Sequence, residues 1–195
     1  ITPTDQSEIF EITGDYFIVA TGSSPRSPSW VPFDNECVFD SDTILNIKHL
    51  PKNVTIIGAG VIGLELGTVW RRLGTKVTIL EAAPEFLANI DRTVAKEAKK
   101  LFSRQGLDIR LRTTVTEADV ANGKVTVIYT GLNGERTLDV DNLFVAVGRV
   151  PNISGLGAED VRLALDPRGV IAVDEHCQTN LDKVYAVGDV VRGPM

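Results

Sequence analysis

Runs of hydrophobic residues that end at glycine mark alternating strands and helices in the middle of the chain. Residues 54–57 and 76–81 are short runs rich in Val, Ile and Thr, which is typical of buried strands. Residues 61–73 have the length and composition of a helix, and a glycine ends it. The stretch 91–105 places its apolar side chains on one helical face and most of its lysines on a solvated face. With a third strand predicted at 107–111, this order implies parallel strands joined by right-handed crossovers.

The pattern changes after this third strand, because hydrophobic and polar residues now alternate. Residues 124–129 and 136–140 are separated by a turn at 132–134, which predicts antiparallel strands of a β-meander. Residues 143–147 are a continuous apolar run that ends at Gly148, which is typical of a buried strand. The sequence therefore predicts an α/β fold: a Rossmann-like domain with a parallel sheet, helices on both faces and an antiparallel β-meander.

Both ends of the chain lack this regular order. The strand signals near the start are limited to 8–12 and 16–20, and the tail has signals at 170–173 and 184–187. We expect 16–20 and 184–187 to pair with each other, and we expect the chain to be part of a longer protein. The predicted divisions are a first flank at 1–41, the Rossmann-like domain at 42–150 and a second flank at 151–195.

Composition and charge exclude several classes of protein. The 195 residues carry 20 Lys and Arg against 26 Asp and Glu, and this net charge of −6 disfavours binding to nucleic acid or to an anionic membrane. The apolar stretch 54–70 contains Glu65 and is shorter than the roughly 20 residues of a membrane span. Two cysteines are too few for a disulfide scaffold or a Cys-rich metal site, and they suit a reducing compartment. We expect a cytoplasmic protein, or one of the mitochondrial matrix in a eukaryote.

A glycine-rich turn joins the first predicted strand to the first predicted helix. The segment Gly58-Ala59-Gly60-Val61-Ile62-Gly63 fits G-x-G-x-x-G in the strand–turn–helix setting that a dinucleotide-binding loop requires. Gly58 would permit the tight turn, Gly60 the close approach of a pyrophosphate, and Gly63 the close packing of the helix on the strands. The N–H groups and the positive dipole at the helix start would hold the phosphates. The alternative is a glycine turn that packs the helix and binds no ligand.

Glu81 ends the second predicted strand and bears on the choice of cofactor. A carboxylate at this position accepts hydrogen bonds from the adenosine ribose and repels a 2′-phosphate. Residues 82–85 contain no Arg that would bind such a phosphate. The sequence therefore predicts NAD rather than NADP. Glu65 lies inside an otherwise apolar helix, where a carboxylate is either exposed to solvent or paired near a site.

Several motifs occur in an order that resembles a known family. They are Thr21-Gly22-Ser23, the run from Gly58 to Gly67, the strand ending in Glu81, Gly148-Arg149-Val150-Pro151-Asn152 and Tyr185-Ala186-Val187-Gly188-Asp189. Together they resemble the flavin-dependent pyridine nucleotide–disulfide oxidoreductases over nearly the whole chain, and residues 63–70 and 188–195 look most like the dihydrolipoamide dehydrogenases of that family. The resemblance implies a homodimeric enzyme that takes electrons from dihydrolipoamide, carried on an acyltransferase lipoyl domain, and passes them through a disulfide and FAD to NAD+.

The resemblance also assigns residues to the two cofactors. It implies that Glu65 lies near the nicotinamide, Glu81 holds the adenosine ribose, Val115 lies against the adenine and Gly148 lines the nicotinamide side. The full set implied for NAD is Gly58, Ala59, Gly60, Val61, Ile62, Gly63, Leu64, Glu65, Glu81, Val115 and Gly148. The set implied for FAD in the parent enzyme is Thr21, Gly22, Ser23 and Asp189. The resemblance also implies that residues 1–41 are a remnant of the FAD domain with a linker, and that 151–195 are a returning segment of that domain.

The chain departs from the family pattern at the redox centre. Members have a Cys-x4-Cys pair near the flavin, whereas Cys37 and Cys177 lie far apart in the sequence and outside any such motif. His49 and His176 also lack the setting of the family's catalytic His–Glu pair. We therefore expect no catalytic residue and no metal site in this chain, and no activity of the chain alone. The alternatives are another family member (a soluble transhydrogenase, mercuric reductase or NADH oxidase), a non-catalytic NAD-binding module, or a structural interaction domain.

Overall fold

The computed structural model describes residues 11–193, which divide into two compact units. The central unit is the continuous stretch 25–148, and the flanking unit combines the chain up to Ser24 with the chain from Arg149 onward. Most of the strand predicted at 8–12 lies outside the described residues, and Glu11 and Ile12 are not in a strand.

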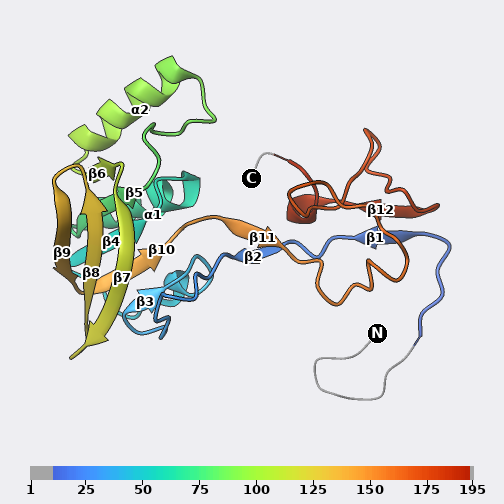
Figure 1. Cartoon of the computed structure of the whole chain (residues 1–195), viewed down its shortest axis with the longest axis horizontal. Helices are drawn as coiled ribbons and strands as arrows, with labels where there is room; N and C mark the ends of the chain where they lie inside the picture. Colours follow the sequence, from blue (N-terminus) through green and yellow to red (C-terminus); the bar gives the residue numbers. More distant parts are fainter. Residues whose placement is uncertain (1–10, 194–195) are drawn as a thin grey trace. The chain divides into compact units, whose positions relative to one another are not determined.

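A parallel sheet forms the middle layer of the central unit (Figure 1). Its strands, in order across the sheet, are β3 (Val38–Phe39), β10 (Asn142–Val145), β4 (Asn53–Ile57), β5 (Lys76–Glu81) and β6 (Asp108–Leu111). All neighbouring strands are parallel, and the parallel pairing of β4, β5 and β6 confirms the sequence prediction. Helix α1 (Val61–Arg72) connects β4 to β5, and helix α2 (Arg92–Arg104) connects β5 to β6. A short 3-10 helix, η1 (Ile44–Asn46), lies between β3 and β4.

Both helices cover the same face of this sheet. Ile56 of β4 and Ile79 of β5 belong to one apolar cluster with Leu64 and Trp70 of α1 and with Ala95 of α2. Neighbouring residues along a strand point to opposite faces, so every second residue of β4 and β5 contributes to this core. The predicted helices at 61–73 and 91–105 are therefore confirmed, and both pack on one side.

Three antiparallel strands cover the other face. They are β7 (Thr114–Ala121), β8 (Lys124–Gly131) and β9 (Gly134–Val140), which pair in that order. Val125 and Val127 of β8 are fully buried in a second cluster with Ile57, Leu80 and Val145 of the parallel sheet. The predicted α/β architecture with a meander is thus confirmed. The expectation of helices on both faces is wrong, because the apolar side of the meander takes the place of a second helical layer.

The central unit begins before the predicted boundary at residue 42. Strand β3 pairs with β10, and Val31 and Cys37 are buried in the core beneath the meander. The stretch 25–41, which the sequence places in an irregular flank, therefore packs with the parallel sheet.

The flanking unit is built on one parallel strand pair from opposite ends of the chain. β1 (Phe17–Val19) pairs with β12 (Val184–Ala186), which confirms the predicted pairing of these segments. Ile171, Ala186 and Val190 are fully buried and form the core of this unit. The strand predicted at 170–173 is reduced to isolated bridges at Ile171. The remaining elements are β2 (Ser23–Pro25), which pairs with β11 (Arg149–Pro151), and the 3-10 helix η2 (Gly188–Val190).

Among the described residues 11–193, no helix has the length and apolar character needed to cross a membrane. The longer of the two α-helices, α2, has 13 residues.

Candidate nucleotide-binding site

The glycine-rich turn lies at the carboxyl end of β4, in the middle of the parallel sheet. Backbone hydrogen bonds hold it between the neighbouring strands: the Gly58 N–H donates to Leu80 (2.9 Å), and the Ala146 N–H donates to Ile57 (2.8 Å). Because the strands are parallel, the carboxyl ends of β4, β5 and β10 meet at one edge of the sheet. In open α/β sheets, ligands bind at this edge.

Two glycines of the motif are required by close packing. Gly58 has a φ of +103°, and a Cβ there would collide with the carbonyl oxygen of Ala146. A Cβ on Gly63 would collide with the carbonyl oxygen of Gly58. One turn further along α1, a Cβ on Gly67 would lie 3.0 Å from Ile56 Cδ1, tighter than ordinary van der Waals contact. The missing side chains thus let α1 begin immediately beside β4.

The middle glycine has a different environment. No atom lies within 4 Å of where a Cβ on Gly60 would be, and its φ of −76° and ψ of −179° suit any residue. Packing therefore does not explain the glycine at this position. Open space in front of the main chain does fit the close approach of a pyrophosphate.

The start of α1 offers backbone N–H donors. Gly60 is the N-cap and supplies no side-chain hydrogen bond, and the first intrahelical bond runs from the Leu64 N–H to the Gly60 carbonyl (3.0 Å). Among the described residues, the N–H groups of Val61, Ile62 and Gly63 have no backbone acceptor. Unpaired N–H groups at the positive end of a helix dipole are the donors that a phosphate needs.

The Glu81 carboxylate connects the glycine loop to the segment after β5. Its Oε2 accepts a hydrogen bond from the Ala59 N–H (2.8 Å), and its Oε1 accepts one from the Ala83 N–H (2.7 Å). Each carboxylate oxygen can accept a further hydrogen bond. The side chain is partly exposed, so it can also accept bonds from ribose hydroxyls. The arrangement fits an adenosine ribose beside the loop.

The junction between β6 and β7 also reaches this strand end. The Thr113 N–H donates to the Glu81 carbonyl (2.9 Å), and the Arg112 N–H donates to the Ala83 carbonyl (3.1 Å). Val115 follows in β7, but it is only 7% exposed, because its side chain belongs to the core between the meander and the parallel sheet. A contact between Val115 and an adenine would therefore be made by the main chain of Val115 and not by its side chain. No local sequence signal identifies Arg112 as part of this strand end, because only the pairing of β6 with β5 brings its backbone there.

The nicotinamide-side candidates are less constrained. Glu65 is exposed on α1 and makes no hydrogen bond or ion pair with any described residue. Gly148 has a φ of +104°, and its carbonyl accepts a hydrogen bond from the Arg26 N–H (2.9 Å). Within the loop and helix start, Ala59 and Leu64 are buried, Val61 is exposed and Ile62 is intermediate. Glu65 is therefore available to a ligand, although no contact within the described chain holds it toward one.

The residues implied for FAD come together in the flanking unit. Ser23 Oγ donates to Asp189 Oδ2 (2.9 Å) across a separation of 166 residues. Arg149 Nε donates to Ser23 Oγ (2.7 Å), and another guanidinium nitrogen donates to the Ser23 carbonyl (2.6 Å). Asn152 donates through its backbone N–H to the Gly22 carbonyl (2.9 Å) and through Nδ2 to the Thr21 carbonyl (2.9 Å). This network fixes the backbone of residues 21–23 beside η2.

Neither cysteine forms a disulfide. Cys37 is buried before β3, and desolvation by burial raises the pKa of its thiol, with Asp34, Glu36 and Asp141 adding to the effect. Cys177 is exposed in the flanking unit. In the described part of the chain, no group of three or more His, Cys, Asp or Glu side chains could hold a metal ion.

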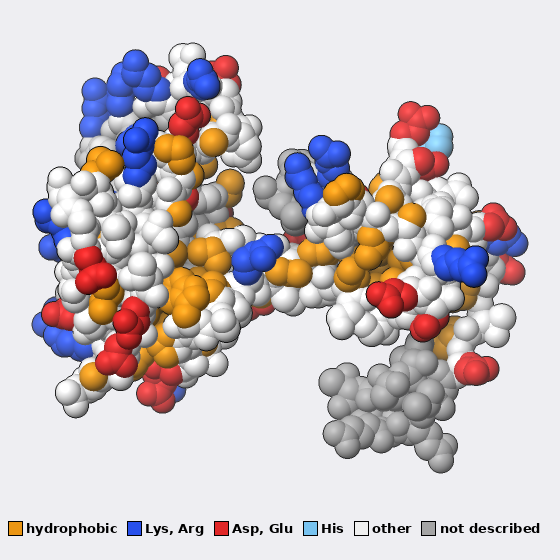
Figure 2. Space-filling view, viewed as in Figure 1, with side chains coloured by type: hydrophobic (Ala, Val, Ile, Leu, Met, Phe, Trp, Pro, Cys, Tyr) orange, Lys and Arg blue, Asp and Glu red, His pale blue; other side chains and the backbone are white. Residues whose placement is uncertain are grey.

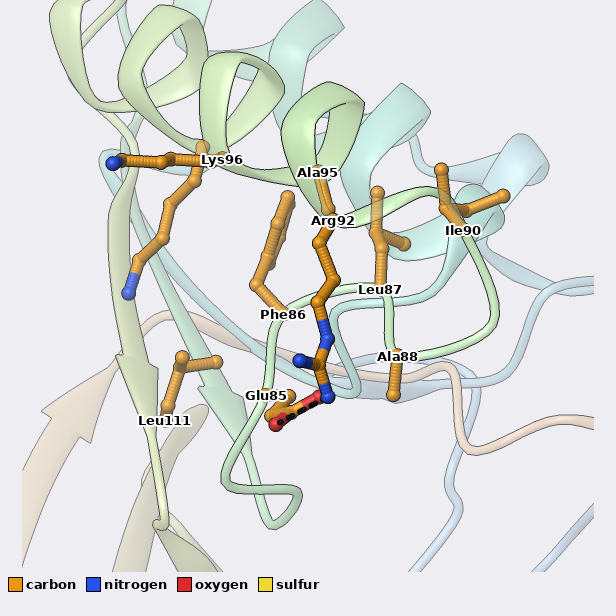
Figure 3. A pocket seen from close by; sticks show the side chains of 10 residues that line it. Glu85, Phe86, Leu87, Ala88, Ile90, Arg92, Ala95, Lys96 and Leu111 are labelled. Atoms are coloured by element: carbon orange, nitrogen blue, oxygen red, sulfur yellow. Dashed lines mark ion pairs between the residues drawn. The ribbon is translucent and has the colours of Figure 1, made fainter.

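A separate cavity of about 340 Å³ lies beside α2 (Figure 3). Phe86, Ala95 and Leu111 contribute apolar walls. Glu85 and Arg92 also line the cavity and form an ion pair with each other (3.9 Å). Lys and Arg side chains also gather over α2 (Figure 2), where Lys100 pairs with Glu97 (2.6 Å). The residues lining this cavity are all different from those proposed to bind the dinucleotide.

Known proteins share both the sequence and the fold of this chain. A dihydrolipoyl dehydrogenase of Cupriavidus necator is 50% identical over 185 residues, which is 94% of this chain and 39% of that protein. The flavoprotein disulfide reductase RclA from Escherichia coli, solved as a Cu(II) complex of a cysteine-to-serine mutant, superposes with a TM-score of 0.83 at 34% identity over 95% of this chain and 41% of its own. LpdA from Mycobacterium tuberculosis superposes with a TM-score of 0.86 at 28% identity, over 97% and 40% of the two chains.

The chain thus spans about two fifths of the length of these relatives. A sequence profile described as pyridine nucleotide-disulphide oxidoreductase matches residues 1–195. Since this match extends over the whole chain, and since the chain has the parallel sheet, meander and glycine turn described above, it belongs to the pyridine nucleotide–disulfide oxidoreductase family of flavoproteins.

Proposed function

We propose that this chain is the NAD(H)-binding part of a flavoprotein disulfide oxidoreductase of the dihydrolipoamide dehydrogenase type. The observation that carries the proposal is the hydrogen bond that the Glu81 carboxylate accepts from the Ala59 N–H. Ala59 belongs to the glycine loop that leads directly into α1. The 50% identity to a dihydrolipoyl dehydrogenase supports the choice within the family. The parent enzyme would convert dihydrolipoamide and NAD+ to lipoamide and NADH.

Each part of the site has a defined task in this proposal. The N–H groups at the start of α1 bind the pyrophosphate, Gly60 leaves room for it, and Glu81 accepts hydrogen bonds from the adenosine ribose. Glu65 and Gly148 lie toward the nicotinamide. When bound, FAD and NAD+ supply the carrier and the acceptor of the hydride, and the protein supplies orientation and electrostatics.

The flanking unit would contribute to the FAD site. The bonded cluster of Ser23, Asp189 and Arg149 supports this assignment, because it places polar side chains and the backbone of residues 21–23 together. The lipoyl domain of an acyltransferase and a second copy of the enzyme remain proposed partners. A reducing compartment, the cytoplasm or the mitochondrial matrix, suits the two free thiols.

Cofactor choice tests the proposal directly. We expect NADH to bind at least tenfold more tightly than NADPH, since a hydrogen bond to a charged group contributes about 1.5–3 kcal/mol and the carboxylate repels a 2′-phosphate. Glu81→Gln should remove most of this preference in titrations followed by calorimetry. The control is Glu85→Gln, which removes the same charge at the separate cavity and should leave the preference unchanged. Equal affinity of the unaltered protein for both nucleotides would contradict the assignment.

A second candidate is a disulfide reductase with another substrate. The TM-score of 0.83 to RclA at 34% identity supports this alternative, and the same glycine loop would serve a soluble transhydrogenase, mercuric reductase or NADH oxidase. Steady-state assays of the holoprotein with dihydrolipoamide and NAD+ separate the two. NAD binding without turnover of dihydrolipoamide would favour the second candidate, or a non-catalytic NAD-binding module.

A further inference from the structure

An arginine from a distant part of the sequence lies at the same strand end as Glu81. The Arg112 N–H donates to the carbonyl of Ala83, whose own N–H donates to Glu81 Oε1 (3.1 and 2.7 Å). The next residue, Thr113, donates to the Glu81 carbonyl (2.9 Å). The backbone of Arg112 is therefore tied directly to the segment that follows β5.

The side chain of Arg112 is exposed, and its guanidinium makes no hydrogen bond or ion pair with any residue in the range 11–193. Its backbone adopts a φ of +54°, a conformation that an L residue adopts at some cost. Arg110 provides a contrast: its guanidinium is bound by Asp108 and by the Tyr129 hydroxyl, at 2.6 Å in each case. Of these two arginines, only Arg112 has a guanidinium ready for a new partner.

Dinucleotide-binding domains use two residue types at this location. A carboxylate binds the 2′-hydroxyl of NAD, whereas a nearby Arg accommodates the 2′-phosphate of NADP. Here both types are present, because Glu81 ends β5 and Arg112 reaches it from the β6–β7 junction. Residues 82–85 contain no Arg, but Arg112 supplies a cation at the same strand end.

We propose that Arg112 is a specificity-determining residue: it provides a cationic subsite for a ribose 2′-phosphate, and the charge of Glu81 opposes binding there and outweighs the attraction. The inference rests on the proposed NAD(H) function and adds to it. The exclusion of NADP(H) depends on one carboxylate, so neutralising Glu81 exposes an affinity for 2′-phosphate that Arg112 supplies. A planar guanidinium binds phosphate oxygens in pairs, which suits this role.

The test measures the Kd of NADH and NADPH for the holoprotein, purified with all of its natural flanking sequence. Glu81→Gln should shift the preference toward NADPH by at least tenfold, and adding Arg112→Ala should abolish most of that gain. Arg104→Ala in the Glu81→Gln background is the matched control, because it removes the same charge from the exposed end of α2. Arg112→Lys should retain part of the gain. The Arg112-dependent part should also shrink as salt increases.

The outcomes separate this inference from the proposed function. If the unaltered protein fails to bind NADH, the proposed function fails. If NADH binds and depends on Glu81, but Arg112→Ala and Arg104→Ala have the same effect on NADPH, only the inference is overturned. Should Glu81→Gln melt too early to be titrated, Arg112→Ala alone decides the question: it should weaken NADPH at least threefold and leave NADH unchanged. An unchanged NADPH affinity would overturn the proposal.

Discussion

Three glycines of one motif carry out different tasks, and substitution by alanine distinguishes them. Gly58 has a positive φ and no room for a Cβ beside the Ala146 carbonyl. Gly63 has no room beside the Gly58 carbonyl, although its own backbone is helical. Gly60 has both an ordinary backbone conformation and open space. Stability should therefore depend on the outer two glycines, and ligand binding on the middle one.

Gly58→Ala should lower the melting temperature strongly. A Cβ there both strains the left-handed backbone and pushes β4 away from β10, and such combined effects cost roughly 2–4 kcal/mol. Differential scanning calorimetry measures the change.

Gly60→Ala is the matched comparison at the same loop. The added methyl meets no protein atom, so the melting temperature should stay within about 2 °C of that of the unaltered protein, whereas NADH affinity should fall by an order of magnitude or more. The physical reason is that the methyl occupies the space through which a pyrophosphate approaches the N–H groups. Unchanged NADH affinity would place the phosphates elsewhere.

At the scale of elements, one aspartate organises the turn that leads into β3. Asp34 Oδ1 accepts hydrogen bonds from the N–H groups of Glu36, Cys37 and Val38 at 2.8–2.9 Å. Desolvation by burial raises the pKa of Asp34, but these three bonds together outweigh it and leave the pKa below its usual value of 3.8. The ionised form is therefore favoured in the folded protein.

The stabilisation by Asp34 should depend on pH. Because its pKa is lowered on folding, the contribution is present above the unfolded value of 3.8 and is lost as pH falls through the folded value. Asp34→Ala should cost about 1 kcal/mol at pH 7, since the group is exposed and partly screened, and the difference from the unaltered protein should shrink toward pH 3. Urea unfolding at both pH values measures it. Asp34→Asn keeps one acceptor oxygen and should lose less at pH 7; an equal loss would contradict the hydrogen-bond account.

The sequence pattern predicted most of the parallel sheet but not all of it. The strands at 54–57 and 76–81 and the helices between and after them follow from apolar periodicity and glycine stops, which are local signals. β3 has two residues, and β10 is its one neighbour in the parallel sheet, so no local pattern identifies it. The sequence pattern also predicts no strand at β7, where a register shift between Val115 and Glu117 interrupts the alternation.

The candidate site divides in the same way. The glycine loop and Glu81 can be predicted from residue spacing, because a strand, a turn and a helix follow one another along the chain. Arg112 cannot be predicted from spacing, since it comes close to Glu81 only because β6 pairs with β5. The prediction of helices on both faces is wrong for a related reason: whether a helix or a meander covers a sheet depends on long-range packing.

At the scale of the whole molecule, the residues for the two cofactors are distributed unequally. Every residue proposed for NAD lies within the continuous unit 25–148, which has two apolar cores of its own. The residues proposed for FAD are limited to 21–23 and Asp189 in the flanking unit. The chain should therefore retain one cofactor and not the other.

We expect purified residues 1–195 to be colourless and inactive with dihydrolipoamide and NAD+. NADH at tenfold its Kd should raise the melting temperature by about 3–5 °C, whereas FAD should leave it unchanged. A few hydrogen bonds of about 1 kcal/mol each do not offset the roughly 4–15 kcal/mol lost on immobilising a large ligand. NADPH serves as the matched nucleotide control. A flavin that stays with the chain through gel filtration would show that the flanking unit forms more of the FAD site than proposed.

The pairing of β1 with β12 has a consequence for the order of folding. Paired residues of these strands are 167 positions apart in the sequence, so in an unfolded chain their encounter closes a very long loop. Once the central unit has folded, its two ends are adjacent, because the Arg26 N–H is bonded to the Gly148 carbonyl. The remaining loop is then several times shorter, which reduces its closure entropy by roughly 1 kcal/mol. Contact order thus favours a sequential pathway during synthesis, in which the central unit folds first and the flanking unit is completed only after β12 has left the ribosome.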